Sequence, residues 1–315
     1  MRRTLLPFWR ILPLLLLAWV PALRAASVDC GIGAAGVTVR VAVGATGRTM
    51  LLHRPQGADP ARPAPLLFLL HGSGGNGAAI LKRSGLEDTA DRHGFIVAAP
   101  DAGIPQGSGF VWNIPGVPST SGRMPQPGDA DDVAFFGQAI DWLAAHQCVD
   151  RRRVYATGLS GGGRMTSLLG CVAADRFAAI APVVGLRAGR PSPADPRRSD
   201  PASCRPSRPV PLIAFAGDED TTNPIAGGGA PYWQYSMAAA MARWSALNGC
   251  STALPRTRVS TSVYQEGYGR CRAGADVIAR VTIGGTHDWV VDNEAMWAFL
   301  SRHHRGSRAI DPSIR

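Results

Sequence analysis

Apolar and polar residues alternate along two short segments near the start of the chain, and the pattern then changes. Residues 37–43 (VTVRVAV) and 48–54 (RTMLLHR) alternate as half-exposed antiparallel strands do. After Pro65 the apolar residues form short continuous runs, which are typical of strands buried on both faces of a parallel sheet. These runs are 66–70 (LLFLL), 95–100 (FIVAAP), 153–158 (RVYATG), 177–185 (FAAIAPVVG) and 210–217 (VPLIAFAG).

Helix-like stretches separate these runs. They cover residues 86–94, 131–147, 163–174 and 232–249. Alternation of strands and helices predicts an α/β fold with a mostly parallel central sheet, helices on both faces and an antiparallel N-terminal edge. In such sheets ligands bind outside the carboxyl ends of the strands, so chemistry is expected there.

Residues 1–26 have the order of a secretory signal peptide. Arginines come first, an apolar run follows from Ile11 to Val20, and small residues close the segment. The apolar run is about half of the roughly 20 residues that a membrane-spanning helix needs, although a retained anchor remains the alternative. We expect residues 1–26 to be cleaved, residues 27–304 to form one catalytic domain and residues 305–315 to be a flexible tail. We expect the mature protein to be periplasmic or extracellular, without stable membrane association.

The charge is basic, and arginine carries almost all of it. Residues 1–26 hold four arginines and no acid, so their removal lowers the formal charge from +10 to +6. The basic patches are not interleaved with the aromatic residues and repeats of nucleic-acid-binding modules. We therefore expect no nucleic-acid partner; the oligomeric state stays open.

Six cysteines follow the signal segment, an even count that indicates disulfides in an exported chain. The sequence contains no C-x-x-C pair, the spacing that would indicate a metal site. Six cysteines allow 15 pairings. The first choice is Cys250 with Cys271, which bracket a hairpin-like segment; weaker choices are Cys171 with Cys204 and Cys30 with Cys148.

The most informative strand end is the stretch YATGLSGGGRM. A strand-like run leads to Ser160, with Gly158 and Gly162 on either side, and a helix-like stretch follows. A nucleophile on a strained strand-to-helix turn needs small neighbours, because strand and helix backbones approach closely there. The N-terminus of the helix would also favour a developing oxyanion. The context predicts that Ser160 is a nucleophile rather than a structural serine.

Three further strand ends supply possible partners. Residues 71–75 (HGSGG) follow one strand, and their glycines would let backbone N–H groups face a ligand. Asp218, Glu219 and Asp220 follow another strand, and His287 follows the last. The order serine, acid, histidine is that of α/β-hydrolases. A plain glycine turn at 71–75 and solvated acids remain the structural alternatives.

In combination the segments resemble a secreted esterase family. They are LLHGSGGN, GFIVAAPD, DDVAFFGQAIDWL, CVDRRRVYATGLSGGGRM, FAAIAPVVG, AFAGDEDTTNPIAGG and GGTHDWV, between about residues 48 and 299. The family is carbohydrate esterase family 1, which contains polyhydroxybutyrate depolymerases and feruloyl and acetyl-xylan esterases. The resemblance implies an α/β-hydrolase fold and a serine esterase that needs no metal or cofactor.

Carried over position by position, the resemblance implies Ser160 as nucleophile, His287 as base and Asp220 as acid, with Asp218 as the fallback. It implies oxyanion donors at the backbone N–H of Gly161 and of Gly72 or Ser73. The adjacent Asp131 and Asp132 match a family pair, although capping of the following helix accounts for them.

This chain departs from the family's motifs at two places that border the acyl pocket, and the departures leave the identity of the substrate open. Gly161 stands where members often have Asn, and Thr286-His287-Asp288-Trp289 replaces a common G-H-T-W. Trp112 and Trp289 are candidate walls of the acyl pocket, with buried packing as the alternative. We expect a hydroxyacyl oligomer or a feruloyl ester as substrate, and no appended module for solid polymer. Alternatives are an acetyl-xylan or other short-acyl esterase, or a non-catalytic binding protein on this scaffold.

Overall fold

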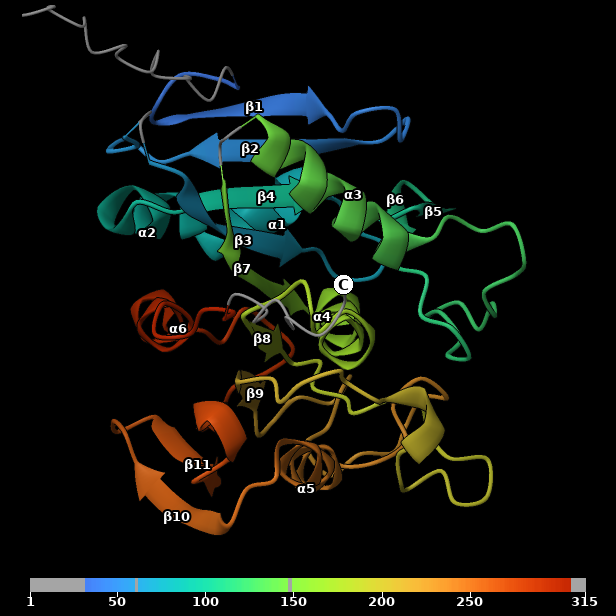
Figure 1. Cartoon of the computed structure of the whole chain (residues 1–315). Helices are drawn as coiled ribbons and strands as arrows, with labels where there is room; N and C mark the ends of the chain where they lie inside the picture. The colour runs from blue at the N-terminus through green and yellow to red at the C-terminus, as the bar shows by residue number, and fades with distance from the viewer. Residues whose placement is uncertain (1–31, 60–61, 147–148, 307–315) are drawn as a thin grey trace, which may run out of the picture.

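The computed structural model describes residues 32–59, 62–146 and 149–306. Over these residues the main sheet runs in the order β1-β2-β4-β3-β7-β8-β9-β12-β11-β10 (Figure 1). Its strands are β1 (Val37–Ala42), β2 (Thr49–Arg54), β3 (Ala64–Leu70), β4 (Ile96–Pro100), β7 (Val149–Leu159), β8 (Ala179–Val183), β9 (Leu212–Gly217), β10 (Thr252–Arg258), β11 (Val263–Gly269) and β12 (Val277–Thr282). A separate hairpin joins β5 (Ile104–Gln106) and β6 (Gly109–Val111).

The centre of the sheet is parallel and both edges are antiparallel. Neighbours from β4 through β3, β7, β8 and β9 to β12 all run in one direction. The pairs β1–β2 and β2–β4 are antiparallel, which confirms the predicted N-terminal edge. The hairpin of β10 and β11 adds a second antiparallel edge beside β12. The sequence indicated that hairpin but not its place in the sheet.

Helices cover both faces of the sheet, as predicted. They are α1 (Gly77–Ser84), α2 (Leu86–His93), α3 (Asp132–Ala145), α4 (Gly161–Val172), α5 (Met237–Asn248) and α6 (Asn293–Leu300). One buried apolar cluster joins α3, α4 and α5 to one face, and a second joins α1, α2 and α6 to the other (Figure 1). The helices α1 and α6 were not predicted from the sequence.

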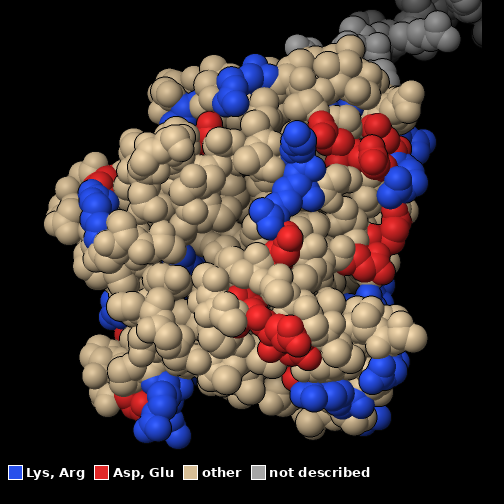
Figure 2. Space-filling model, turned by 180° about the vertical axis from the view of Figure 1, so that it is seen from behind, with Lys and Arg blue, Asp and Glu red and all other residues tan. Residues whose placement is uncertain are grey.

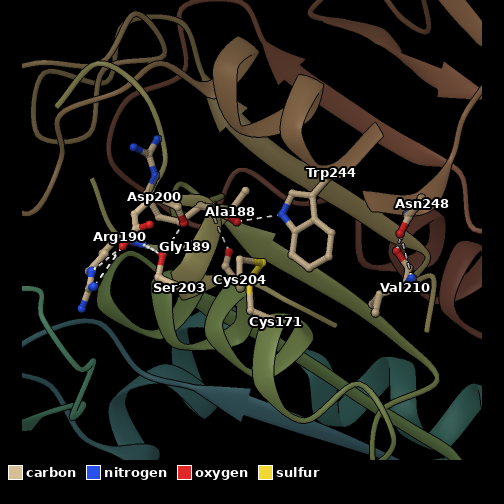
Figure 3. The surroundings of a disulfide bond; sticks show 12 residues. Cys171, Ala188, Gly189, Arg190, Asp200, Ser203, Cys204, Val210, Trp244 and Asn248 are labelled. Carbon is tan, nitrogen blue, oxygen red and sulfur yellow. Dashed lines mark hydrogen bonds and ion pairs between the residues drawn. A yellow bond between two sulfur atoms is a disulfide. The ribbon is translucent and has the colours of Figure 1, made fainter. Parts of the chain in front are cut away.

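Two of the expected disulfides are present. Cys171 on α4 is bonded to Cys204, and Cys250 is bonded to Cys271 around the β10–β11 hairpin. Figure 3 shows the first bridge joining α4 to the segment that carries Ser203, beside Arg190 and Asp200. This bridge therefore fixes the proline-rich excursion of residues 189–209 to the helix that begins after Ser160. The proposed pair Cys30–Cys148 lies outside the described residues.

The two ends of the chain are only partly described. The predicted signal segment, residues 1–26, lies outside the described residues, as do residues 307–315 of the expected tail. Arg305, the first residue of that tail, donates from its backbone N–H to the carbonyl of Arg152 at 2.9 Å. Within the described ranges no helix is long and apolar enough to cross a bilayer.

Charged side chains are dispersed over the face shown in Figure 2. Small groups of basic and acidic residues lie next to each other there, and neither sign forms a continuous patch on that face. Many arginines are paired with a neighbouring carboxylate, among them Arg83 with Asp288 and Arg190 with Asp200. On this face the positive charge is therefore divided among small groups rather than concentrated.

Candidate active site

Ser160 occupies a strained turn between β7 and α4. Its backbone has φ 55° and ψ −111°, in the left-handed half of conformational space that non-glycine residues rarely occupy. A Cβ on Gly158 would lie 2.6 Å from the Leu70 Cβ, and one on Gly162 would lie 2.2 Å from the Leu70 carbonyl oxygen. The two glycines are therefore required by the contact of strand, turn and helix, as the motif predicted.

The strand next to β7 holds this turn in place. The Ser160 N–H donates to the carbonyl of Val183 at 2.9 Å, at the end of β8. Val184, which follows Val183 at the end of β8, also has a positive φ of 41°, which is an outlier for a β-branched residue. Its N–H donates to Phe215 at 2.8 Å, and its carbonyl accepts from the Asn223 side chain at 2.6 Å. Two strained residues thus lie side by side, each fixed by hydrogen bonds.

Asp220 and His287 meet in a direct hydrogen bond. His287 Nδ1 lies 2.8 Å from Asp220 Oδ2, with the Asp220 side chain 1% exposed and that of His287 24% exposed. The other oxygen, Oδ1, accepts the backbone N–H groups of Thr222 and Asn223, each at 2.8 Å. Burial opposes ionisation, but these hydrogen bonds outweigh it and lower the pKa of Asp220. The carboxylate is thus charged and fully occupied.

The neighbouring acids have other partners. Asp218 Oδ1 accepts the backbone N–H of Gly284 at 2.7 Å, which ties the end of β9 to the loop after β12. The Glu219 N–H donates to the carbonyl of Gly285 at 2.9 Å, and its side chain is exposed. Of the three candidate acids, only Asp220 contacts His287. The fallback acid Asp218 instead positions the loop that carries the histidine.

The loop beyond His287 is fastened to α1. Asp288 forms an ion pair with Arg83 at 2.6 Å, and this guanidinium helps to lower the pKa of Asp288 against the opposing effect of burial. Trp289 donates from its indole to Asn293 at 3.1 Å and packs against the apolar cluster under α6. These contacts fix both ends of the segment around His287.

The glycine-rich loop after β3 lies directly against the start of α4. A Cβ on Gly161 would lie 2.4 Å from the Ser73 Oγ and 2.9 Å from the Ser73 backbone nitrogen. The N–H groups of Gly74 and Gly75 donate to the carbonyls of Phe110 and Gly72. The N–H groups of Ser73 and Gly161 are thus close neighbours at the predicted oxyanion site, and Ser73 rather than Gly72 adjoins Gly161.

His71 fixes the shape of this loop. Its Nδ1 lies 2.8 Å from the Gly72 carbonyl, and its Nε2 lies 3.0 Å from the backbone nitrogen of Ala102. These partners require the tautomer with the proton on Nδ1, since Nε2 must accept from an N–H. Burial lowers the pKa of His71, which keeps the ring neutral. His71 therefore acts as a structural support behind the loop.

A cleft of about 620 Å³ brings the predicted residues together. Ser160, His287, Gly72 and Ser73 all line it. Lys82 and Arg83 from α1 stand at its side. An ester carbonyl entering this cleft would meet Ser160, His287 and the loop that carries Ser73.

Neither predicted tryptophan is among the residues lining this cleft. The Trp112 side chain is 5% exposed, stacks at a centroid distance of 5.7 Å on Phe136, and donates from its indole to the His71 carbonyl at 2.8 Å. Trp289 packs under α6 as described above. These contacts favour the packing alternative for both residues, with Trp112 bracing the 71–75 loop from behind.

The acid pair before α3 divides into two roles. Asp131 caps the helix, since its side chain accepts the backbone N–H of Ala134 at 2.9 Å. Capping does not account for Asp132, which is buried and accepts from Arg48 at 2.7 Å and from the backbone N–H groups of Gly103 and Asn113. Asp132 therefore holds together the loops on either side of the β5–β6 hairpin. No cluster of three or more His, Cys, Asp or Glu suited to a metal ion occurs in the described ranges.

Comparison with known proteins identifies the chain. Residues 49–218, more than half of its length, match the family described as esterase PHB depolymerase. The chain belongs to this family. This confirms the resemblance drawn from the motifs, and the α/β-hydrolase fold agrees with it.

Named relatives of the family fall into both expected groups. Feruloyl esterase B of Piromyces equi is 30% identical over 263 residues, covering 81% of this chain and 45% of that protein. Poly(3-hydroxyalkanoate) depolymerase C of Paucimonas lemoignei is 36% identical over 138 residues, 43% of this chain and 31% of that protein. The chain thus spans less than half of the length of these two relatives.

A solved structure shows the same fold. The acetyl xylan esterase from Aspergillus awamori superposes with a TM-score of 0.60 at 14% identity, covering 84% of this chain and 99% of that one. At this identity the likeness concerns the fold alone. It confirms the α/β-hydrolase architecture of the family member described here.

The sequence did not reveal several residues that shape this esterase-family site. Asn223 holds both Asp220 and Val184, and Arg83 holds the histidine loop through Asp288. A polar residue just after a candidate acid could have drawn attention to Asn223. Nothing in the local sequence of α1 could have indicated its contact with residue 288.

Proposed function

We propose that this protein is a secreted serine carboxylic-ester hydrolase of the polyhydroxybutyrate depolymerase and feruloyl esterase type. The observation that carries the proposal is the Asp220–His287 hydrogen bond in the same cleft as the strained Ser160. Membership of an esterase family supports the reaction class. The disulfides support export, because they persist in oxidising compartments.

In the first step the Ser160 hydroxyl oxygen attacks the ester carbonyl carbon while His287 Nε2 accepts the hydroxyl proton. The hydrogen bond from Nδ1 to Asp220 selects the tautomer that leaves Nε2 free to accept. It also stabilises the imidazolium that forms. The charged Asp220 can do this at neutral pH, because its pKa is lowered.

The tetrahedral intermediate carries its negative charge on the former carbonyl oxygen. The backbone N–H groups of Gly161 and Ser73 are proposed as its donors, since the two residues are in contact at the start of α4. The N-terminus of this helix adds positive potential at the same point. His287 then gives its proton to the leaving alcohol, which departs and leaves an acyl-enzyme on Ser160.

In the second step water replaces the alcohol. His287 accepts a proton from the water, the hydroxyl oxygen bonds to the acyl carbon, and the bond to Ser160 breaks as the serine regains its proton. The products are one carboxylic acid and one alcohol. None of these steps requires a group other than Ser160, His287, Asp220 and the two amides.

The substrate candidates are a short hydroxyacyl oligomer and a feruloyl ester, following the names of the relatives. The test measures initial hydrolysis rates of a 3-hydroxybutyrate trimer and of methyl ferulate with the native protein and with Ser160→Ala. Loss of the nucleophile is expected to lower kcat by about 10⁴-fold or more. Ser121→Ala, which changes an exposed loop serine, serves as the matched control and should retain full activity.

A fluorophosphonate probe separates the remaining alternatives. Labelling of the native protein that is lost in Ser160→Ala supports an esterase, and the faster ester then defines the substrate group. Labelling without turnover of either ester would direct the search to acetyl-xylan and other short-acyl esters. Absence of labelling at Ser160 would overturn the proposal in favour of a binding protein on this scaffold.

A further inference from the structure

Two buried arginines lie beside the candidate active site and share one cavity. Arg164 is on α4, one helical turn after Ser160, and Arg187 follows β8. Only 4% of the surface of Arg164 and 6% of that of Arg187 is exposed. The cavity that both line holds about 40 Å³ and is otherwise bounded mainly by apolar and small residues such as Ile114 and Val117.

Arg164 reaches toward the oxyanion loop. Its Nη2 donates to the Ser73 Oγ at 3.2 Å, and its guanidinium lies 4.3 Å from the ring centroid of Tyr232. Its Nε is buried without a hydrogen-bond partner among the described residues. A smaller cavity, lined by Ser73, Gly161 and Arg164, adjoins the same side chain. Arg164 therefore links the 71–75 loop to the cavity that it lines with Arg187, which we call the arginine cavity.

Arg187 is held rigidly but incompletely. Nε donates to the carbonyl of Leu186 and Nη1 to that of Tyr235, each at 2.6 Å, and the guanidinium lies 3.5 Å from the Trp233 ring centroid. Its Nη2 is buried and has no acceptor in the part of the chain described. The plane of the group is thus fixed while one donor is left unused.

Within the described ranges no carboxylate is paired with either guanidinium. Other arginines do have a carboxylate partner: Arg48 contacts Asp132 at 2.7 Å, and Arg190, at the edge of this same cavity, contacts Asp200 at 2.9 Å. Burial lowers the pKa of Arg164 and of Arg187 to about 10, so both remain charged at neutral pH. Two like charges are therefore buried together without an anion, which is costly unless something supplies one.

We infer that this cavity is a subsite for a free carboxylate on the substrate, held by Arg164 and Arg187. The inference rests on the proposed esterase function and names its substrate class: esters that carry a carboxylate close to the scissile bond. Guanidinium groups match carboxylates in geometry and charge. A cavity of about 40 Å³ has room for a carboxylate but not for an aromatic ring or a sugar.

The position of the cavity limits how far the carboxylate lies from the reacting carbonyl. Arg164 is four residues after Ser160 on α4, about 6 Å along the helix axis, and bonds to the loop that carries the Ser73 amide. The test therefore uses esters whose carboxylate is separated from the scissile carbonyl by a few atoms. The 3-hydroxybutyrate dimer has such a carboxylate on its alcohol side, and monoethyl adipate has one on its acyl side.

The experiment compares each acid with its own carboxamide, which keeps the shape and removes the charge. kcat/KM of the native protein is measured for the 3-hydroxybutyrate dimer and its terminal amide, and for monoethyl adipate and monoethyl adipamate. In at least one series the carboxylate is expected to react about 10- to 100-fold faster, as loss of a charge-assisted buried contact implies. The series that shows the preference identifies the side of the ester that enters the cavity.

Arg187→Gln is expected to lower this ratio toward one, because one of the two guanidinium groups that hold the carboxylate is removed. Arg187 is chosen rather than Arg164 because its guanidinium bonds to Leu186 and Tyr235 and not to the loop that carries Ser73. Arg208→Gln is the matched control: it removes a guanidinium bonded to the carbonyls of Ala174 and Pro209, outside the cavity, and should leave the ratio unchanged. If Arg187→Gln does not fold, inhibition of the native protein gives the same information. Adipate should then compete with a neutral ester, whereas adipamide should not.

The two proposals fail in different ways. Hydrolysis of the amides at a rate equal to that of the acids, with no inhibition by adipate, would overturn the carboxylate subsite and leave the esterase assignment intact. A preference that persists in Arg187→Gln would also overturn it. Absence of any Ser160-dependent hydrolysis, in acids and amides alike, would instead overturn the proposed function.

Discussion

Two sets of charged side chains lie near the Ser160 turn, and they differ in how completely the fold satisfies their hydrogen-bonding groups. Around Asp220 both carboxylate oxygens are occupied, one by His287 and the other by two backbone N–H groups. Around Arg164 and Arg187 two like charges share a cavity, and each guanidinium has a buried donor without a partner in the described part of the chain. The described residues thus satisfy the first set but not the second.

This difference separates chemistry from recognition. A catalytic dyad must be organised before the substrate arrives, since reorganising it during the reaction would add to the barrier. A recognition site gains affinity from groups that the free protein leaves unpaired. Changes to the first set should therefore slow all esters equally, whereas changes to the second should affect only esters that carry a carboxylate.

Asp220→Asn should give the largest effect of the variants that follow and should not distinguish acidic from neutral esters. The amide cannot stabilise the imidazolium and favours the wrong tautomer of His287, so kcat should fall by about 10³- to 10⁴-fold. Steady-state kinetics on both ester types checks this. Asp218→Asn is the control, because Asp218 only accepts from Gly284; a similar loss in this variant would contradict the assignment of Asp220.

Gly161→Ala should come next. The added methyl group would lie 2.4 Å from the Ser73 Oγ and 2.9 Å from its nitrogen, which would force the two proposed oxyanion donors apart. Loss of one such donor costs about 10²- to 10³-fold in kcat. Rates of acidic and neutral esters should fall together, with the Asp220–His287 pair unaffected. Retention of normal kcat would show that the oxyanion is bound elsewhere.

Removal of the Cys171–Cys204 disulfide should sharpen the contrast between the two sets. The bridge spans 33 residues and fixes the 189–209 excursion, whose residues Arg190 and Ser203 border the arginine cavity (Figure 3). Cys171→Ala/Cys204→Ala should lower the free energy of unfolding by about 3–4 kcal/mol. At temperatures below the unfolding transition, the variant should still hydrolyse neutral esters, while its preference for esters that carry a carboxylate declines. Cys250→Ala/Cys271→Ala, at the far edge of the sheet, should destabilise without changing that preference.

His303 extends the comparison to a third side chain, which has a buried nitrogen without a hydrogen-bond partner in the described ranges. Burial, together with the positive charges of Arg302, Arg208 and His304, lowers the pKa of His303 from 6.5 to about 4, and its Nε2 is buried without an acceptor among the described residues. Since the unfolded chain binds the proton more readily, this group's contribution to stability is present above pH 6.5 and is lost as the pH falls toward 4. Allowing for solvent screening, the loss is about 1–2 kcal/mol.

Urea unfolding of the native protein and of His303→Asn between pH 4 and pH 7 measures this contribution. The variant should lose less stability on acidification than the native protein. His304→Asn is the control, since His304 is exposed and has the smallest of the effects that lower the pKa of His303, so the pH dependence of this variant should stay close to that of the native protein. Equal slopes in all three proteins would show that His303 is hydrated and titrates normally.

The sequence by itself determined the fold class and pointed to Ser160 and His287, with the acid left between Asp220 and Asp218. Buried strands appear as continuous apolar runs, and a strand, a serine between glycines and a helix lie next to one another in the chain, so the turn at Ser160 is encoded locally. The disulfide Cys250–Cys271 was the first choice from the sequence because these residues bracket a hairpin, whereas Cys171–Cys204 was only a weaker choice. Chain order alone placed an acid and His287 after the serine.

Only the tertiary structure decided which groups meet. Asp218 and Asp220 are equivalent in the sequence, but the loop after β12 gives Gly284 to the first and His287 to the second. Trp112, expected at the pocket, is turned behind the oxyanion loop. Arg164 and Arg187 are ordinary arginines in the sequence, and their shared burial arises because α4 and the segment after β8 pack together. Local patterns depend on neighbouring residues, whereas the pairing of charges depends on strand order and on how loops pack over the ends of the sheet.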